Sequence, residues 1–316
     1  MRELGRVMAP RPNGLRGGAA RPLLGGAFRR YPGPAMPRPP GELGARLIRG
    51  SERVDRAFRR LERLRAELVL AFASDAVLDR YNDLMYSHSP DYDPASPDFL
   101  DFLYPWEEET IEWFFPPAPA RILVGAAGAG REAFALSERG YEVVAFEPSA
   151  GLTGFMASRS RSRPDGVRVF KAVYEDLPSL APAEPGRART RLDELAPFDG
   201  SLMGLGSISH VRTPENRVRA LRQFGAATKG PVVVSFLTRR MVPVSSRPSV
   251  DRLRRTLRAR RGRSPADGFS LDAGFFHLFD EAEIRDLADR AGLDVIHYDD
   301  DVRRVYPHVV LIAQNT

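Results

Sequence analysis

The 316-residue sequence contains no cysteine and only two lysines, Lys171 and Lys229. Without cysteine the chain can form no disulfide, no thiolate metal site and no cysteine nucleophile. It also lacks an uninterrupted run of roughly 18 apolar residues, the length that a membrane-spanning helix needs. Its Arg-rich amino-terminal segment is not followed by the apolar stretch of a signal peptide. We therefore expect a soluble, cytoplasmic protein with no membrane partner.

The positive charge is concentrated in two segments. Residues 1–50 contain ten arginines against two acidic residues, and residues 239–263 contain ten arginines against one. Because the net charge of the whole chain is only +6, the remaining residues are acidic overall. The near absence of lysine indicates a coding bias toward arginine more than selection for phosphate binding, which argues against nucleic acid as a partner.

Three regions follow one another along the chain. Residues 1–50 are rich in Gly, Pro and Arg without helical or strand periodicity, which predicts a disordered tail. Residues 51–119 are predicted to form a helical and aromatic extension or lid that starts with an amphipathic helix. The apolar residues of this helix recur at three- and four-residue spacing: Val54, Phe58, Leu61, Leu64 and Leu68. Because this pattern lasts barely two heptads, we expect packing on the main domain rather than a coiled coil. A homodimer remains an alternative.

The third region, residues 120–316, alternates short apolar strands with helices, as doubly wound α/β proteins do. Strands are expected at residues 122–124, 143–146, 167–172, 201–205, 232–237, 294–298 and 308–313. Helices are expected at 214–224 and 280–291, the second with Asp280 as its N-cap and Gly292 after its end. An Arg-rich insertion at 239–268 interrupts this pattern; we expect it to be a solvated helix, and the alternative is that it selects an anionic substrate.

A glycine-rich turn at residues 125–130 joins the first strand to a helix. Small residues there let a ligand approach the backbone, and the N–H groups at the helix start can bind an acceptor. Glu147 ends the next strand, nineteen residues after Gly128, where its carboxylate can accept hydrogen bonds from both hydroxyls of a ribose. The spacing also fits the dinucleotide fingerprint. Glu132 in the first helical turn would repel a pyrophosphate, although Arg131 beside it weakens this argument.

From about Tyr81 to its carboxyl terminus the chain resembles class I S-adenosylmethionine (SAM) dependent methyltransferases. Four segments carry the resemblance: 121–132 (RILVGAAGAGRE), 141–147 (YEVVAFE), 173–177 (VYEDL) and 198–210 (FDGSLMGLGSISH). The resemblance implies a Rossmann-like, mostly parallel seven-stranded sheet with an antiparallel last strand, and S-adenosyl-L-methionine as the cofactor. One departure is Ala127, where many members of the family have glycine.

The resemblance also implies which residues bind the cofactor. They lie in the glycine turn and at the ends of the following strands: Gly125, Ala126, Gly128, Gly130, Glu147, Pro148, Glu175, Asp176 and Gly204. Asp176 is expected to contact the exocyclic amine of the adenine. The Asn/Asp-Pro-Pro segment that related enzymes use on planar amino groups is replaced here by Gly204-Leu205-Gly206-Ser207, which argues against adenine and glutamine as substrates. The predicted reaction is methylation of an oxygen or nitrogen atom of a small molecule.

Two histidines are candidate general bases, because imidazole titrates near neutral pH. His210 follows the fourth strand, and His88 lies in an aromatic segment before the first strand. That segment is a candidate lid, and the predicted substrate pocket comprises Tyr81, Tyr86, Trp106 and Ser207. These aromatic rings could equally pack in the hydrophobic core. His210 could cap a loop without transferring a proton. No group of His and carboxylate residues has metal-ligand spacing, so no metal is predicted.

Two other functions stay open on the sequence alone. An NAD(P)-dependent oxidoreductase fits the glycine turn, although no Tyr-x-x-x-Lys pair can be built from either lysine. A non-catalytic nucleic-acid or protein-binding module on a methyltransferase scaffold would use the two Arg-rich segments.

Overall fold

The structure is a computed structural model. It describes residues 42–88, 101–163, 166–183, 186, 188–241, 258, 262–303 and 305–314, without the side chains of residues 42, 43, 59 and 88. Most of the predicted tail, residues 1–41, lies outside the described residues, as do residues 242–257 and 259–261 of the predicted insertion. No helix in the described part of the chain is long and apolar enough to cross a membrane.

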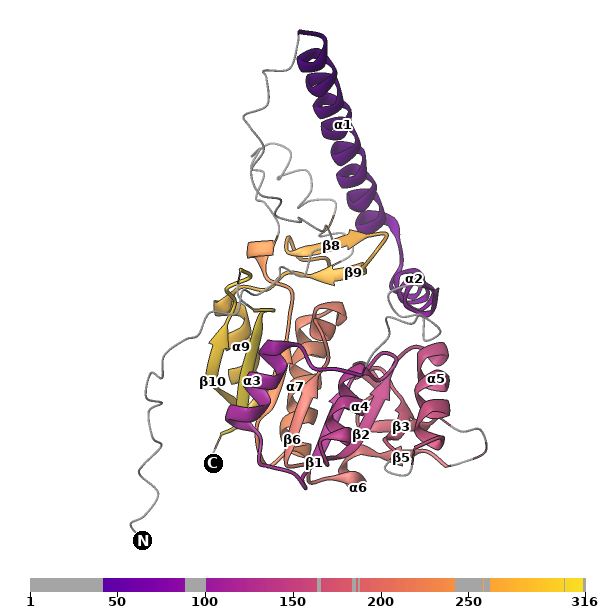
Figure 1. Cartoon of the computed structure of the whole chain (residues 1–316), viewed down its shortest axis with the longest axis vertical. Helices are drawn as coiled ribbons and strands as arrows, with labels where there is room; N and C mark the ends of the chain where they lie inside the picture. Colours follow the sequence, from indigo (N-terminus) through magenta and orange to yellow (C-terminus); the bar gives the residue numbers. More distant parts are fainter. Residues whose placement is uncertain are drawn as a thin grey trace, which may run out of the picture. The chain divides into compact units, whose positions relative to one another are not determined.

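A twisted sheet forms the centre of the fold (Figure 1). In the described residues it has nine strands in the order β10-β11-β7-β6-β1-β2-β3-β4-β5. The strands in chain order are β1 (Arg121–Gly125), β2 (Glu142–Glu147), β3 (Arg168–Lys171), β4 (Ser179–Pro182), β5 (Thr190–Arg191), β6 (Gly200–Met203), β7 (Val232–Ser235), β10 (Leu293–Asp299) and β11 (His308–Ala313). Strands β1, β2, β3, β6 and β7 are parallel, and β11 runs antiparallel between β7 and β10. The predicted Rossmann-like sheet is confirmed, with β4 and β5 as additions that the sequence did not predict.

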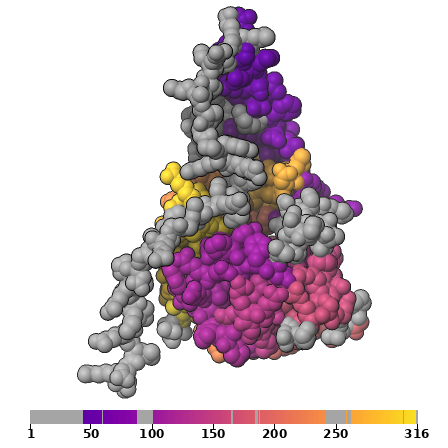
Figure 2. Space-filling model, in the orientation of Figure 1, coloured from indigo at the N-terminus to yellow at the C-terminus, as the bar shows by residue number. Residues whose placement is uncertain are grey.

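Helices cover both faces of this sheet. Strand residues alternate between the two faces, so Ile122 and Val124 belong to one apolar cluster and Leu123 to the other. The first cluster is completed by α3 (Pro105–Phe114), α4 (Arg131–Glu138) and α5 (Ala150–Arg161), and the second by α6 (Leu192–Leu195), α7 (Pro214–Ala227) and α9 (Glu281–Ala291). In the space-filling view of the same orientation, the purple-to-magenta surface from α3 to α4 is continuous (Figure 2). The sheet is therefore shielded from water on this face.

Helix α9 has both of its predicted ends. The Asp280 carboxylate accepts a hydrogen bond from the backbone N–H of Glu283 at 3.0 Å, and Gly292 ends the helix with a φ of 77°. These groups satisfy backbone donors and acceptors that the helix itself leaves unpaired. Local sequence thus determines where this helix begins and ends.

The amino-terminal helix differs from the prediction. Helix α1 spans Glu42–Phe72, so the tail predicted to reach residue 50 is nine residues too long. The apolar face expected to pack on the main domain is exposed, with Phe58 at 63% and Leu61 at 61% exposure. The other members of that face are exposed too: Val54, Leu64 and Leu68. The expectation was wrong because only the last turns of α1 reach the folded body.

Those last turns pack on a β-hairpin. The hairpin consists of β8 (Asp267–Ser270) and β9 (Gly274–His277), neither of which the sequence predicted. Leu70 of α1, Leu78 of α2 (Asp75–His88) and Phe275 of β9 form a small separate core with Phe269. In Figure 1 the hairpin stands beyond the ends of the strands of the sheet. The hairpin and α2 therefore cover one end of the strands, and we call these two elements together the cap.

A buried charged network fastens the cap to α7 and α9. His277 lies between two carboxylates, with Nδ1 2.7 Å from Asp267 and Nε2 2.7 Å from Glu283. Arg217 is fully buried, donates to the carbonyl of Val211 at 2.8 Å and lies 3.6 Å from Glu283. Because the buried charges are paired and hydrogen-bonded, the cost of removing them from water is offset. The network gives His277 two specific partners, Asp267 and Glu283.

The described arginines of the 239–268 segment are also paired within the chain. Two lie in or beside the 3-10 helix η4 (Arg239–Met241) and two lie near the hairpin. Their partners are acidic residues: Arg239 pairs with Asp280, Arg240 with Asp300, Arg258 with Glu67 and Arg263 with Asp75. These four guanidinium groups therefore stabilise the fold, and their charge is already compensated.

Candidate functional site

The carboxyl ends of the parallel strands bring the predicted cofactor segments together. β1 pairs with β2 on one side and with β6 on the other. The turn after β1, the acid that ends β2 and the segment after β6 consequently lie side by side, at the edge where doubly wound proteins bind ligands. Two short 3-10 helices complete this edge, η2 (Tyr174–Asp176) after β3 and η3 (Ser207–His210) after β6.

The turn after β1 contains three alternating residues in the left-handed conformation. Their φ angles are 51° at Ala126, 57° at Gly128 and 97° at Gly130. Among the described residues Ala126 is the single non-glycine residue with positive φ, a conformation that costs an L-residue roughly 1–2 kcal/mol. The alanine whose backbone conformation favours glycine is therefore Ala126. Ala127 does not have a positive φ, so its position does not require glycine.

Gly125 has a different reason to lack a side chain. A Cβ atom there would lie 2.6 Å from the ring of Phe224 and 3.0 Å from that of Phe146. Both rings belong to the buried cluster beneath the sheet. Gly125 therefore permits core packing, while the cofactor prediction for this turn depends on the residues from Ala126 to Gly130.

Glu147 holds the turn in place. It is 6% exposed and accepts hydrogen bonds from the backbone N–H of Gly128 at 2.9 Å and of Ser149 at 2.8 Å. Burial raises the pKa of the Glu147 carboxyl to about 7, and the nearby carboxylate of Glu132 contributes to the same effect. Pro148 lies half-buried between Glu147 and Ser149. Each carboxylate oxygen keeps accepting capacity for a ligand hydroxyl.

The start of α4 is negatively charged. The Arg131 guanidinium donates to both carboxylate oxygens of Glu107 at 2.7 Å and lies 2.9 Å from buried Glu132. Two carboxylates therefore face one guanidinium, and Glu147 adds a third acid nearby. Arg131 compensates both Glu107 and Glu132, which leaves one of these two negative charges unbalanced. Such a site repels a pyrophosphate and attracts a cation.

The segment after β6 contacts the glycine turn closely. The N–H of Gly204 donates to the carbonyl of Gly125 at 2.9 Å, and a Cβ on Gly204 would lie 2.8 Å from the carbonyl oxygen of Ala126. Further along, the Ser207 and Tyr174 hydroxyls form a 2.7 Å hydrogen bond. Burial raises the pKa of Tyr174, so its phenol stays protonated and cannot serve as a base.

The two acids of η2 differ in their surroundings. Glu175 is half-buried, and burial raises its pKa, whereas the Asp176 side chain is exposed. A half-enclosed carboxylate makes stronger hydrogen bonds than a solvated one. The contact of Asp176 with an adenine amine stays a prediction, and Glu175 beside it is the less exposed of the two acids.

His210 and Tyr86 meet at this edge. The Tyr86 hydroxyl is 2.8 Å from Nε2 of His210, and Nδ1 of His210 is 2.7 Å from the carbonyl oxygen of Phe275 in β9. The residue after Tyr86, Ser87, makes a 2.8 Å hydroxyl–hydroxyl hydrogen bond with Ser149, whose N–H binds Glu147. Two side chains predicted separately from the sequence are thus direct partners, close to the predicted ribose acid.

The other predicted pocket residues lie elsewhere or outside the described side chains. Tyr81 donates to the carbonyl of Leu271 at 2.9 Å and packs against Phe269, so it belongs to the hairpin core rather than to the site. Trp106 is buried and stacks on Tyr306, and its Nε1 has no hydrogen-bond partner among the described residues. His88 ends α2, and its side chain lies outside the described atoms.

The sequence offered no signal for three groups that shape this site. The Phe275 carbonyl comes from a hairpin that was not predicted, Ser149 acts through its backbone as well as its hydroxyl, and Tyr174 points inward from a short helix. In the described part of the chain no three His, Cys, Asp or Glu side chains are grouped as a metal ion would require.

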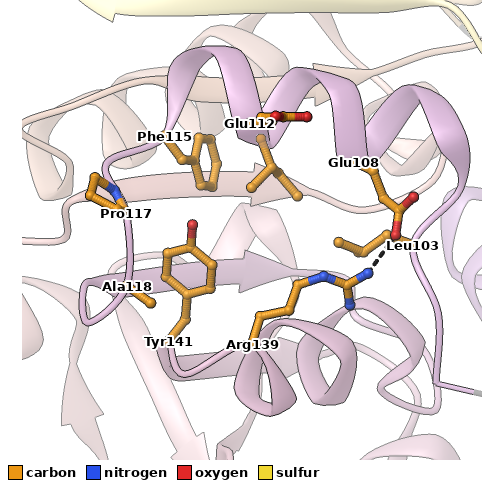
Figure 3. A pocket seen from close by; sticks show the side chains of 9 residues that line it. Leu103, Glu108, Glu112, Phe115, Pro117, Ala118, Arg139 and Tyr141 are labelled. Atoms are coloured by element: carbon orange, nitrogen blue, oxygen red, sulfur yellow. Dashed lines mark hydrogen bonds and ion pairs between the residues drawn. The ribbon is translucent and has the colours of Figure 1, made fainter.

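A pocket of about 540 Å³ lies at the opposite edge of the sheet (Figure 3). It is formed by α3, the start of β2 and the end of α4, and Leu103 and Phe115 line its apolar wall. At its rim Arg139 and Glu108 form an ion pair, and the Tyr141 hydroxyl donates to a backbone carbonyl at 3.1 Å. Arg139, Glu108 and Tyr141 are thus engaged within the protein, while Glu112 also lines the pocket. It is separate from the site described above.

Comparisons with known proteins address the fold. No protein-family model matches the sequence, and no curated protein sequence matches it. Among solved structures, the CcbJ methyltransferase from Streptomyces caelestis is 15% identical, with a TM-score of 0.50 over 74% of this chain and 98% of its own. DesVI from Streptomyces venezuelae is 15% identical, with a TM-score of 0.44 over 65% of this chain and 89% of its own. CalS10 from Micromonospora echinaspora, described as a SAM-bound amino pentose methyltransferase, is 14% identical, with a TM-score of 0.42 over 62% and 84%. The likeness to CcbJ establishes that this chain has a methyltransferase fold.

Proposed function

We propose that this protein is a SAM-dependent methyltransferase that transfers a methyl group to an oxygen or nitrogen atom of a small molecule. The observation that carries the proposal is a set of buried carboxylates at the glycine turn. Glu132 and Glu147 are both buried there, and the Arg131 guanidinium is shared between Glu107 and Glu132. SAM carries a sulfonium and an ammonium group and no phosphate, so its charge matches this site.

The residues of the site fit this cofactor group by group. The Glu147 carboxylate would accept hydrogen bonds from the ribose hydroxyls, and Glu175 would lie near the adenine. Gly204 and the turn from Ala126 to Gly130 leave the backbone accessible to the rest of the molecule. When bound, the cofactor supplies an electrophilic methyl carbon on a positively charged sulfur. The chain then has to orient the acceptor and exclude water, because the transfer is an in-line displacement.

The alternatives receive less support. A dinucleotide would place its pyrophosphate at the start of α4, where Glu132 is buried and the Arg131 guanidinium already balances Glu107 and Glu132. A nucleic-acid-binding module would need free basic side chains, yet the described arginines of the 239–268 segment pair with acids of the same chain. The remaining arginines of the two basic segments lie outside the described residues.

We also propose that the protein forms a homodimer through α1. Four exposed apolar residues of this helix are seven positions apart: Leu47, Val54, Leu61 and Leu68. Seven-residue spacing keeps a stripe facing a partner helix along its length. In an antiparallel pair Leu47 would face Leu68 and Val54 would face Leu61, so a second copy fits the stripe. With Phe58 and Phe72, each helix would contribute roughly 600 Å², near the lower limit of about 1,200 Å² in total for stable interfaces.

Equilibrium binding tests the cofactor assignment. Isothermal titration of the full chain should show micromolar affinity for S-adenosylhomocysteine and none for NADH. Tight NADH binding without binding of S-adenosylhomocysteine would refute the proposal. A library of small molecules incubated with methyl-labelled SAM would then identify the acceptor.

A further inference from the structure

One negative charge at the start of α4 stays unbalanced among the described residues. The Arg131 guanidinium is shared by the carboxylates of Glu107 and Glu132, which are 1% and 4% exposed. The Glu107 oxygens contact only N–H groups, those of Arg131 and of the Tyr104 backbone, so this group accepts throughout, as an ionised carboxylate does. Two buried carboxylates therefore face one guanidinium, and the cluster is negative overall.

The Arg131 guanidinium has no terminal N–H left for a ligand. Its Nη1 donates to the Phe102 carbonyl and to Glu107, and its Nη2 donates to Glu107 and lies 2.9 Å from Glu132. These acceptors use all the hydrogens of the two terminal nitrogens. The Arg131 Cζ also lies 4.3 Å from the ring centroid of Tyr104 and 5.0 Å from that of Phe102. Arg131 is thus fixed in place and holds Oε1 of Glu132.

The Glu132 carboxylate lies at the cofactor edge of the sheet. Its Oε1 would be 3.4 Å from a Cβ on Gly204, the residue whose N–H binds the Gly125 carbonyl. Burial raises the pKa of the Glu147 carboxyl and the charge of Glu132 adds to that effect, so the two acids are close to each other. Oε2 of Glu132 has no hydrogen-bond partner in the described part of the chain. It can therefore accept from a ligand.

Two opposing charges decide which group this position binds. The N-terminus of a helix carries roughly half an elementary positive charge, which favours an anion such as the carboxylate of an amino acid. The unbalanced carboxylate at the same place carries a full negative charge, so the position favours a cation. An ammonium group can also donate hydrogen bonds to Oε2, whereas a sulfonium has no proton to donate.

We infer that Glu132 binds the ammonium group of the cofactor's amino acid and thereby selects cofactors that carry this group. The inference rests on the proposed methyltransferase function. Glu147 and Glu132 then have separate tasks, since Glu147 accepts from the ribose hydroxyls and Glu132 accepts from the ammonium. Because Arg131 already holds the Glu132 carboxylate, little side-chain freedom is lost when the ligand binds.

Ligand affinity tests this assignment without any turnover. Isothermal titration of the full chain compares S-adenosylhomocysteine with its deamino analogue, in which a hydrogen atom replaces the ammonium group. The wild type should bind the analogue about 10- to 100-fold more weakly, because a hydrogen bond between two charged groups is lost. Glu132→Gln should lose a similar factor for S-adenosylhomocysteine and bind the deamino analogue at least as tightly as the wild type does.

A purely structural role for Glu132 gives a different result. If Glu132→Gln weakens both ligands by the same factor, or changes neither, the inference is wrong. It is also wrong if the wild type binds the two ligands equally, a comparison that does not depend on the folding of a variant. A loss of affinity for SAM that spares S-adenosylhomocysteine would assign Glu132 to the sulfonium and would overturn the inference as well.

A matched control lies at the other end of α4. Glu138→Gln makes the same chemical change at an exposed carboxylate that pairs with Arg163, and it should leave both dissociation constants unchanged. Methylthioadenosine, which lacks the amino acid, separates the two proposals. A wild type that binds neither this ligand nor S-adenosylhomocysteine refutes the methyltransferase function. A wild type that binds S-adenosylhomocysteine and its deamino analogue equally well refutes only the role of Glu132.

Discussion

The pKa of Glu147 makes cofactor affinity depend on pH. In the unliganded protein burial raises this pKa to about 7, so half of the molecules carry a neutral carboxyl at that pH. Ribose hydroxyls donate to a carboxylate, and a cationic cofactor also favours the charged form. Binding should therefore require the ionised group and weaken as the pH falls below 7.

The size of this effect follows from the linkage between binding and proton release. If the bound carboxyl has a pKa near its ordinary 4.5, affinity falls about tenfold for each pH unit below 7. Between pH 8 and pH 5.5 the dissociation constant should rise by about 30-fold, or about 2 kcal/mol. Isothermal titration with S-adenosylhomocysteine measures it directly. Methylthioadenosine keeps the ribose but lacks the amino acid, so it isolates the contribution of Glu147.

The matched variant is Glu147→Gln, which keeps the shape but cannot ionise. Its affinity should be lower at pH 8 by about 1–3 kcal/mol and independent of pH between 5.5 and 8. A dissociation constant of the wild type that does not change over this range would refute the reasoning, as would the same slope in the variant. Stability changes in the opposite direction in the unliganded protein. Because the folded pKa of Glu147 is above that of the unfolded chain, the contribution of this group to stability falls as the pH rises from about 4.5 to 7.

Three further predictions follow from the geometry. Ala126→Gly should stabilise the protein by about 1 kcal/mol, measured by urea unfolding, because Ala126 has a positive φ of 51°; a loss of stability would contradict the strain. Trp106→Phe should lower the melting temperature and leave S-adenosylhomocysteine binding unchanged, because Trp106 is buried in the core and stacks on Tyr306 away from the site; weaker binding with an unchanged melting temperature would place the indole at the cofactor instead. Leu61→Glu should shift a dimer to monomer in light scattering with little change in circular dichroism, whereas the exposed surface variant Glu138→Gln on α4 should not; a wild type that is already monomeric at about 100 µM would refute the dimer.

The sheet was largely predictable because local signals agree with the tertiary arrangement there. A few neighbouring residues are enough to identify the apolar strand at Ile122–Val124. The same holds for both ends of α9 and for the acid Glu147 at the end of β2. Parallel strand order then places their carboxyl ends together without further information. The positive φ of Ala126 was not predictable, because backbone φ cannot be read from an Ala-Ala pair.

The cap was not predictable because its contacts join distant parts of the chain. Phe275 accepts from His210, 65 residues away, and Arg258 pairs with Glu67, 191 residues away. The short strand β8 contains glycine and few β-branched residues, so its pattern is weak. For the same reason the face of α1 was misjudged: helical periodicity identifies an apolar stripe, but whether that stripe is buried depends on what lies beside it.

Burial shifts two pKa values at this site in opposite directions, and both shifts favour the neutral form of the group. It raises the pKa of Glu147 and lowers that of His210, so both groups tend to be neutral in the unliganded protein. A bound cation lowers the pKa of any neighbouring group, because it favours a negative carboxylate and disfavours a positive imidazole. Cofactor binding should therefore ionise Glu147, which strengthens its hydrogen bonds to the ribose, and keep His210 neutral, which preserves the lone pair on Nε2. The hydrogen bond from Nδ1 to the Phe275 carbonyl ties this lone pair to the position of the β8–β9 hairpin.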